Sequence, residues 1–469
     1  MSVLSLLAKK PPAEGYWPLD FPLIRLSPKR EDVFTIEQSF QGIMIFGSNG
    51  SGKSSGSAAL LARKYLANQF GGLVLCAKTD EADRWRSYLR QTGREQDGRF
   101  FSVGGEYRFN FLEHEANQRR AQVENLVNLL IGVARVRRSK IPDEKTVFWT
   151  QEQKKFFRNG LSLLMFAKEP ANVRNLYRIL RSCPETARDA ENERWQEDNY
   201  VCALLSRAIT NAPQNLDVSE IEAYYLRDWP TMRESERSLV KADLTGLLDG
   251  LSRGDIGDLF STTTNLTPND ILNGAVVVVD IPEREFLEIG QYCALIWLQL
   301  LQRAIDRRQY KEPEGRPLFI WQDECHLFAS DRDSVFQATC RSKGVSVVRI
   351  CQNYPLLHLA YGSKEAVDSL LGNCTTKFFH RNDCPETNTW ATKLIAKELS
   401  FEHSIGDSDG KRSINVHRRE EDSCRASEFL ALKDGGKVNR YLVQAIVFQS
   451  GRSWLKGKRR WIVSEFRQQ

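Results

Sequence analysis

The feature that most constrains the fold of this chain is a glycine-rich corner between an apolar run and a helical pattern. Residues 41–46 (QGIMIF) are typical of a buried strand, and residues 55–70 place apolar side chains at helical spacing. The corner matches GxxxxGK[ST], whose glycines let backbone N–H groups surround phosphate oxygens at the start of a helix. The sequence therefore predicts a nucleotide-binding loop made of Gly47, Ser48, Asn49, Gly50, Ser51, Gly52, Lys53, Ser54 and Ser55.

Side-chain chemistry assigns roles within this loop. Lys53 can reach the β- and γ-phosphates of a nucleotide, and the Ser54 hydroxyl can ligate Mg²⁺. We therefore predict ATP and Mg²⁺ as cofactors, with Lys53 among the catalytic residues. A chance match to a short pattern is the alternative, and the flanking strand and helix argue against it.

Short apolar runs alternate with helical patterns on both sides of a longer helical region. The first unit, 41–78, reads as strand, loop, helix and strand, which predicts a parallel sheet. Residues 113–240 lack β-branched runs and carry long amphipathic patterns, so we expect an inserted all-α domain. The last residues alternate like edge strands. Further strands are expected at 275–281, 317–324, 345–352 and 375–381.

The remaining segments complete the predicted organisation. Residues 1–40 contain five prolines and predict an irregular N-terminal arm. Polar residues around 405–414 predict an exposed loop. The α/β domain would then consist of residues 41–112 and 241–469. No run approaches the length needed to cross a bilayer, so we expect a cytoplasmic protein.

A P-loop enzyme needs a second strand that delivers carboxylates to the magnesium ion and to the attacking water. Two strands compete for this role, one ending in Asp280 and the other in Asp323 and Glu324. Adjacent acids serve both functions, so we favour Asp323 as the magnesium ligand and Glu324 as the group that polarises water. The alternative for Asp323 is a helix N-cap.

Two more residues flank the strand at 345–352. Gln352 closes this strand, so its amide would lie near the γ-phosphate in a parallel sheet; a local strand-end role is the alternative. Arg341 precedes the strand and could reach the ATP of a neighbouring subunit, or it could be a solvated surface residue. Both are predicted catalytic residues.

The order of these motifs resembles the coupling-protein ATPases of conjugation and type IV secretion, within the FtsK and HerA type of hexameric DNA translocases. The resembling segments cover most of the chain, with Phe111 in place of a family proline. They are GSNGSGKS (47–54), LVLCAKTDEADRW (73–85), RFNFLE (108–113), FIWQDECHLF (319–328), RSKGVSVVRICQNYPLLHLAYG (341–362) and LLGNCTTKFFHRNDCPETNTWA (370–391).

This resemblance implies a RecA-like motor domain with an all-α domain inserted between the Walker motifs. It also implies a ring of six subunits with ATP at the interfaces, Arg341 acting in trans, and DNA threaded through the centre. Those proteins usually begin with a membrane anchor, whereas the P-loop begins here at Gly47. The chain is therefore expected either to borrow an anchor from a membrane partner or to serve another DNA process, such as mobile-element maintenance or antiphage defence.

Two basic runs are candidate DNA contacts, because sequence-independent binding relies on Lys and Arg at phosphates. Aromatic side chains beside basic ones suit single strands, and solvated surface is the alternative for both runs. A net charge of +6 permits such a partner without requiring it. The runs contain Arg135, Arg137, Arg138 and Lys140, and Arg452, Trp454, Lys456, Lys458, Arg459, Arg460 and Trp461.

Three functional hypotheses remain at this stage. The first is an ATP-driven DNA translocase that works with a partner protein complex. The second is a secretion ATPase that recruits and unfolds proteins, and the acidic stretch 185–200 could dock a protein partner. The third is a scaffold in which nucleotide only holds subunits together. DNA stimulation of ATP turnover, and its loss with salt, distinguishes the first from the others.

Overall fold

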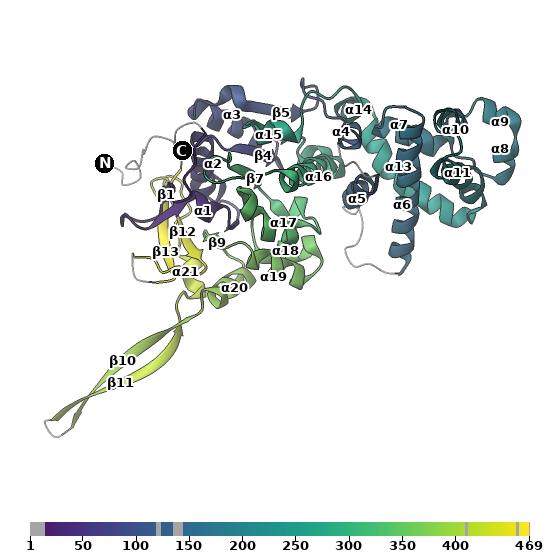
Figure 1. Ribbon diagram of the computed structural model, residues 1–469. Coiled ribbons are helices and arrows are strands. Elements are labelled where there is room, and N and C mark those ends of the chain that lie inside the picture. Colours follow the sequence, from purple (N-terminus) through teal and green to yellow (C-terminus); the bar gives the residue numbers. More distant parts are fainter. Residues whose placement is uncertain (1–14, 119–122, 135–143, 409–410, 456–458, 469) are drawn as a thin grey trace.

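A computed structural model describes residues 15–118, 123–134, 144–408, 411–455 and 459–468, and their side chains except those of 144–146 and 399–419. Its centre is a nine-stranded sheet (Figure 1). In sheet order the strands are β13 (Trp461–Arg467), β12 (Leu442–Gln449), β9 (Thr376–Phe379), β3 (Ile43–Phe46), β8 (Val345–Cys351), β7 (Leu318–Gln322), β4 (Gly71–Leu75), β6 (Val276–Asp280) and β5 (Gly98–Ser102).

The sheet is mainly parallel, as predicted. Neighbouring strands from β9 to β5 pair in parallel, whereas β12 is antiparallel to β9 and β13 is antiparallel to β12. The two closing strands therefore form an edge, as the alternating pattern near the C-terminus predicts. Because β8 lies between β3 and β7, the loops that follow these three strands meet at one edge of the sheet.

Both faces of the sheet are covered by helices. Alternate strand residues such as Val74 and Phe319 pack against α2 and α3 on one face. On the opposite face, the β4, β6 and β7 region packs against α16, and the β3 and β9 region packs against α18 to α20. The covering helices are α2 (Ala59–Ala67), α3 (Glu81–Gln91), α16 (Glu283–Arg307), α17 (Asp333–Thr339), α18 (Tyr354–Tyr361), α19 (Lys364–Gly372) and α20 (Pro385–Ile395).

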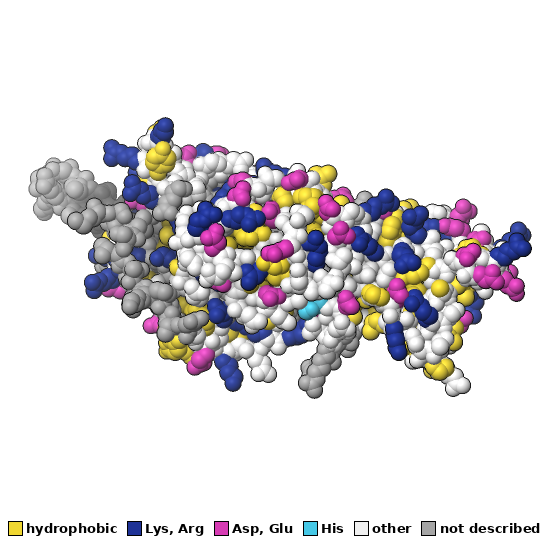
Figure 2. Space-filling view, turned by 90° about the horizontal axis from the view of Figure 1, so that it is seen from above, with side chains coloured by type: hydrophobic (Ala, Val, Ile, Leu, Met, Phe, Trp, Pro, Cys, Tyr) yellow, Lys and Arg dark blue, Asp and Glu magenta, His cyan; other side chains and the backbone are white. Residues whose placement is uncertain are grey.

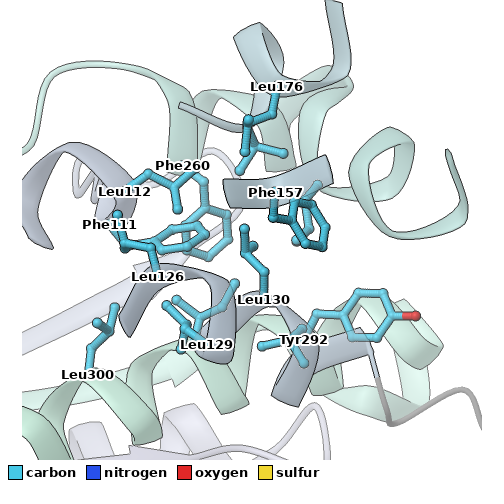
Figure 3. Close-up of a cluster of buried hydrophobic side chains, with 14 of the residues drawn as sticks. Phe111, Leu112, Leu126, Leu129, Leu130, Phe157, Leu176, Phe260, Tyr292 and Leu300 are labelled. Atoms are coloured by element: carbon cyan, nitrogen blue, oxygen red, sulfur yellow. The ribbon is translucent and has the colours of Figure 1, made fainter. Parts of the chain in front are cut away.

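A helical region extends from one end of the sheet, beyond α16 (Figure 1). Its short entry helix α4 (Phe111–Ala116) and the last residues of α16 share one apolar core with it. Figure 3 shows Tyr292 and Leu300 of α16 beside the leucines of α5. The helices are α5 (Val123–Ala134), α6 (Glu144–Phe166), α7 (Val173–Ser182), α8 (Ala187–Glu191), α9 (Glu193–Glu197), α10 (Tyr200–Asn211), α11 (Leu216–Ala223), α12 (Trp229–Thr231), α13 (Glu234–Ser252) and α14 (Gly254–Ser261).

The helical region ends later than the sequence suggests. Helix α13 runs without a break across the expected boundary at 240/241, and both α13 and α14 pack against α7. The side chains of Leu244, Leu248 and Phe260 are buried in the shared core. We therefore propose that the inserted domain extends to Ser261.

The N-terminal segment is structured where it is described, so the prediction of an irregular arm is wrong there. Strands β1 (Pro22–Arg25) and β2 (Val33–Thr35) pair antiparallel, and α1 (Ile36–Ser39) begins with a capping box at Thr35. Trp17 and Phe34 are buried in the same core as α2. Apolar residues between the prolines thus attach this segment to the sheet domain.

The predicted exposed loop at 405–414 is also wrong. Strands β10 (Lys397–Ser408) and β11 (Lys411–Asp422) pair along their whole length, from Lys397 opposite Asp422 to Ser408 opposite Lys411. This hairpin projects away from the rest of the molecule (Figure 1). Its backbone hydrogen bonds hold an extended arm where the polar sequence suggests only a turn.

Three further features concern hydropathy, cysteines and surface charge. Among the described residues, no helix combines the length and apolar character required to span a membrane. All ten cysteines lie in the described part and are free; nine are buried and Cys384 is half-buried. On the face shown in Figure 2, basic and acidic side chains are interspersed.

Candidate nucleotide-binding site

The glycine-rich loop lies at the carboxyl edge of the sheet, between β3 and the helical turn Ser54–Ala58 that precedes α2. Gly50 and Gly52 have φ angles of 74° and 78°, a region that glycine adopts without strain. A Cβ on Gly52 would lie 2.5 Å from Val443 Cγ2, so this position also needs glycine for space. The loop is therefore wound tightly and packed against β12.

The loop is tied to the segment that follows β9. The Ser48 amide donates to the Arg381 carbonyl at 3.0 Å, and its hydroxyl accepts from the Asp383 amide at 2.9 Å. Arg381 in turn pairs with Asp383 and, at 3.3 Å, with Asp434. These contacts fix the backbone of the loop beside the segment that follows β9. Asn49 and Gly50 remain exposed at the tip of the loop.

Lys53 is a buried cation at the centre of this loop. Its residue is 6% exposed, and among the described residues no carboxylate forms an ion pair with its ammonium. Its charge lowers the pKa of Glu324, but no described anionic group contacts it directly, and a buried charge without a direct anionic partner is costly, so such a position calls for an anion. The arrangement fits a phosphate group held by Lys53 and by the amides at the start of the following helical turn.

Ser54 and Asp323 meet across the sheet edge. The Ser54 hydroxyl donates to Asp323 Oδ2 at 3.0 Å, although 269 positions separate the two residues. Asp323 is 3% exposed, and its Oδ1 accepts the Glu324 amide at 3.0 Å. Hydroxyl and carboxylate oxygens are the ligands that Mg²⁺ prefers, so this pair fits a magnesium ion bridging to a nucleotide.

Glu324 lies directly beyond the end of β7 in the left-handed backbone region, with φ of 52°. Its Oε1 accepts from Lys78 Nζ at 2.9 Å and from Gln352 Nε2 at 3.4 Å. Burial raises the pKa of the Glu324 carboxyl, but the hydrogen bond and charge of Lys78, with Lys53 and Gln352, outweigh it and the pKa is lowered. Glu324 is therefore held as a carboxylate.

Asp280, the competing acid, ends β6 at another position along the same edge. Strand β6 pairs with β4 and β5, so two strands, β4 and β7, separate it from β8. Burial raises the pKa of the half-buried Asp280 carboxyl. The structure brings Ser54 to Asp323 rather than to Asp280.

Lys78 and Glu81 also belong to this site, although neither is among the predicted site residues. They follow β4, which pairs with β7, so the ends of these strands bring Lys78 to Glu324. Glu81 is 3% exposed, and its Oε2 accepts the Ala77 amide at 2.9 Å. A lysine and an acid directly after a buried strand in a parallel sheet are the signal that could have identified them.

Arg341 lies apart from these residues. It precedes the amino end of β8, at the opposite edge of the sheet from the glycine-rich loop. Its side chain is 59% exposed and pairs with Glu37 at 3.0 Å. Within one chain it therefore does not join the site. Ser55, at the far end of the loop, accepts a hydrogen bond from Gln468 Nε2 at 2.8 Å.

The C-terminal basic run does not form an aromatic stacking surface. Trp454 and Trp461 are buried, so of the two interpretations of this run the structure favours packing of the tryptophans over stacking on a nucleic acid. The Arg452 guanidinium donates to the carbonyls of Glu31 and Val33, while Arg459 and Arg460 are exposed. The two tryptophans belong to the apolar cores of the sheet domain. Lys456, Lys458, Arg135, Arg137, Arg138 and Lys140 lie outside the described residues.

Comparison with known proteins supports the resemblance expected from the motifs. Residues 317–434 match the family model described as the TraM recognition site of TraD and TraG. No curated protein sequence matches the chain. The segment matched by the family model contains β7, β8 and β9 with their helices, and therefore the part of the sheet that carries Asp323, Glu324 and Gln352.

The whole fold is similar to that of the bacterial conjugative coupling protein TrwB. The unbound form of TrwBΔN70 has a TM-score of 0.64 at 15% identity, and the match covers 95% of this chain and 88% of the solved TrwBΔN70 chain. The TrwB complex with the ATP analogue ADPNP has a TM-score of 0.62 at 15% identity, and the match covers 94% of this chain and 88% of the solved chain. The TrwB complex with ADP and Mg²⁺ has a TM-score of 0.61 at 15% identity, and the match covers 93% of this chain and 87% of the solved chain. The predicted fold class, a RecA-like P-loop domain with an inserted all-α domain, is confirmed.

Proposed function

We propose that this protein is an ATP hydrolase that forms a ring and moves DNA, as a coupling ATPase of conjugative transfer or of a related mobile-element process. The observation that carries this proposal is the buried Lys53 ammonium without a carboxylate partner beside the Ser54–Asp323 pair. TrwB, which has the same fold, has been solved with an ATP analogue and with ADP and Mg²⁺.

Each side chain of the site has a role in this proposal. The loop amides and Lys53 hold the phosphates, and Ser54 and Asp323 hold the magnesium ion, which neutralises charge developing on the phosphoryl oxygens. Glu324, kept ionised by its neighbours, polarises the attacking water. Gln352, which reaches the same Glu324 oxygen, lies between the P-loop strand and the acidic strand and senses the terminal phosphate.

The ring belongs to the proposal because Arg341 is far from the site of its own chain. An exposed guanidinium at the opposite edge of the sheet suits a contact with the ATP of a neighbouring subunit, where it stabilises negative charge in the transition state. We propose a homo-oligomer of six subunits, by analogy with the translocase group, with ATP at each interface.

A partner protein is supported by the match of residues 317–434 to a recognition region of TraD and TraG. We propose that the chain acts with a partner complex, through which it is recruited to the membrane. The exposed acidic helices α8 and α9 lie at the end of the helical region farthest from the sheet and offer a second docking surface (Figure 1).

The test is ATP turnover by the purified chain with and without DNA. We expect DNA to stimulate turnover, and we expect the stimulation to fall steeply between about 50 and 200 mM salt because phosphate contacts release counterions. Stimulation that salt does not weaken, or stimulation only by a protein substrate, would favour a protein-recruiting secretion ATPase. Oligomer formation with ATP but without turnover would favour a scaffold.

Glu324→Gln is the matched variant for the hydrolytic step. It keeps the shape of the side chain and removes its negative charge, so ATP binding should persist while turnover falls at least about a hundredfold. Glu285→Gln changes an exposed glutamate of α16 and serves as the control. Wild-type turnover in Glu324→Gln would show that Glu324 does not activate the water.

A further inference from the structure

The carboxylate of Glu324 is closed off in this structure. Its Oε1 is occupied by two donors, Lys78 Nζ at 2.9 Å and Gln352 Nε2 at 3.4 Å. Its Oε2 is buried and accepts no hydrogen bond from the described residues. A base must lie within hydrogen-bond reach of the water it activates. Oε1 already accepts from two donors, and Oε2 is shielded from solvent with His326 Nδ1 at 3.8 Å, so neither oxygen is exposed to such a water and the site is in a resting arrangement.

A second buried carboxylate lies beside the same lysine. Glu81 begins α3, three residues after Lys78, and its Oε2 is fixed by the Ala77 amide. Its Oε1 is buried and has no hydrogen-bond partner among the described residues. Burial, then the charge of Asp323, raise the pKa of Glu81 to about 8, while Lys78 opposes this rise. The Oε1 atom of Glu81 therefore lacks a hydrogen-bond donor in the described part of the chain.

Lys78 is placed to serve either carboxylate. The charges of Asp323, Glu324 and Glu81 all raise the pKa of Lys78 against the effect of its partial burial. A lysine is a compact charge on a flexible four-carbon chain, so a change of rotamer can redirect its ammonium without moving the backbone. Because β4 lies on the side of β7 away from β8, Lys78 draws Glu324 away from the glycine-rich loop.

We propose that Lys78 is a positioning residue that restrains Glu324 in the resting chain, and that Glu81 accepts the Lys78 ammonium when DNA binding starts turnover. This inference rests on the proposed function and adds the regulation of the same site. Movement of Lys78 to Glu81 completes the unsatisfied Oε1 of Glu81 and frees Glu324 Oε1 for water. The raised pKa of Glu81 keeps it largely protonated at neutral pH, so the approaching ammonium displaces that proton to solvent as the ion pair passes from Glu324 to Glu81.

The experiment measures ATP turnover of four variants with and without DNA. Lys78→Met should raise the DNA-free rate roughly three- to tenfold, because the restraint on Glu324 is gone. Lys78→Arg keeps the charge and should keep the DNA-free rate low. Glu81→Gln should lower the ratio of the DNA-stimulated rate to the DNA-free rate. The double variant, Lys78→Met with Glu81→Gln, should behave like Lys78→Met alone.

The non-additive result distinguishes a switch from a structural role. If Glu81 only supports local packing, Glu81→Gln will lower the stimulated rate equally in both backgrounds, which overturns the proposal. Lys78→Met with wild-type rates, or with both rates abolished while nucleotide still binds, also overturns it. Arg90→Met removes an exposed ion pair, that with Glu95, from the same helix and should change neither rate.

Failure of the switch and failure of the proposed function give different results. A wild-type chain that hydrolyses ATP and responds to DNA, with variants that respond in the same way, removes the switch alone. A wild-type chain without turnover, or without a response to DNA, removes the proposed function and the switch with it. Nucleotide affinity and melting temperature, measured for each variant, identify any protein that fails to fold.

Discussion

Several charged side chains at the sheet edge have hydrogen-bond or ion-pair partners, and Lys53 has no ion-pair partner among the described residues. Asp323 accepts from the Ser54 hydroxyl and the Glu324 amide, and Glu324 Oε1 accepts from Lys78 and Gln352. Lys53 is equally buried but forms no ion pair with a described carboxylate. An unbalanced buried charge costs several kcal/mol in the empty chain. A bound phosphate would remove this cost, so nucleotide should stabilise the fold.

Glu81 allows a prediction about stability and pH at the same scale. Its pKa in the folded chain is about 8, above the unfolded value near 4.5, so the folded state binds the extra proton between these pH values. Wild-type stability should therefore fall as pH rises through this window, by at most about 1.4 kcal/mol per pH unit from this group. Glu81→Gln removes that loss, and its melting temperature should increasingly exceed that of the wild type from pH 5.5 to 7.5.

The control for this measurement is Glu285→Gln, whose carboxylate is exposed on α16. Its melting temperature should follow the wild type at every pH. A constant difference between Glu81→Gln and the wild type across the range would mean that Glu81 is already ionised in the folded chain.

Elements that bury apolar side chains on both faces were predictable, and elements without that pattern were not. The strands β3, β4, β6, β7, β8 and β9 stand out as short apolar runs because helices cover both sides of the sheet. The hairpin β10–β11 has a polar sequence around its tip, so its extent is absent from the hydrophobic pattern. The expected boundary at 240/241 falls inside α13, because the helical pattern continues from Glu234 to Ser252.

The candidate site likewise contains residues that a local pattern predicts and residues that only the fold brings together. The glycine-rich loop and the acids after β7 are local patterns, and side-chain chemistry alone groups them. The contact between Lys78 and Glu324 joins positions 246 residues apart, so it depends on β4 and β7 being neighbours in the sheet. Strand order is a property of the whole fold, and no local pattern states it.

The projecting hairpin gives a prediction for an element. Its strands pair with each other, and their main neighbour outside the pair is α20. Replacing residues 399–420 by Asn-Gly joins Glu398 to Glu421, which face each other across the ladder, through a two-residue turn. The melting temperature should change by less than about 2 °C, and DNA-free ATP turnover should persist, because no core is opened.

A substitution in the edge strand β13 is the comparison for this deletion. Trp461 is buried, and Trp461→Ala should cost about 3 to 5 kcal/mol. A deletion of the hairpin that lowers the melting temperature as much as Trp461→Ala would show that the hairpin contributes to the folded core.

At the scale of the whole molecule, a site that is incomplete in one chain can be tested by mixing chains. Arg341→Ala and Lys53→Ala should each abolish turnover, the first because the neighbouring site lacks its arginine and the second because its own site cannot hold phosphate. Mixed in equal amounts, they should recover part of the wild-type rate, since some interfaces combine an intact Lys53 with an intact Arg341. The measurement is the steady-state rate against mixing ratio.

Glu37→Ala separates this role from a surface ion pair. Glu37 is the partner of Arg341 within the chain, and exposed pairs contribute about 0 to 1 kcal/mol. If Arg341 serves only that pair, the two alanine variants will have the same small effect. Mixtures that remain inactive at every ratio would mean that Arg341 does not complete a neighbouring site.

The distribution of thiols has a practical consequence for spectroscopy. Cys384 is half-buried whereas the other nine cysteines are buried, and it follows Asp383, whose amide donates to the Ser48 hydroxyl. A maleimide dye should therefore label the native chain at a single position without removal of other cysteines. The dye would sit next to the segment that braces the glycine-rich loop, so its emission can report nucleotide arrival and departure in real time.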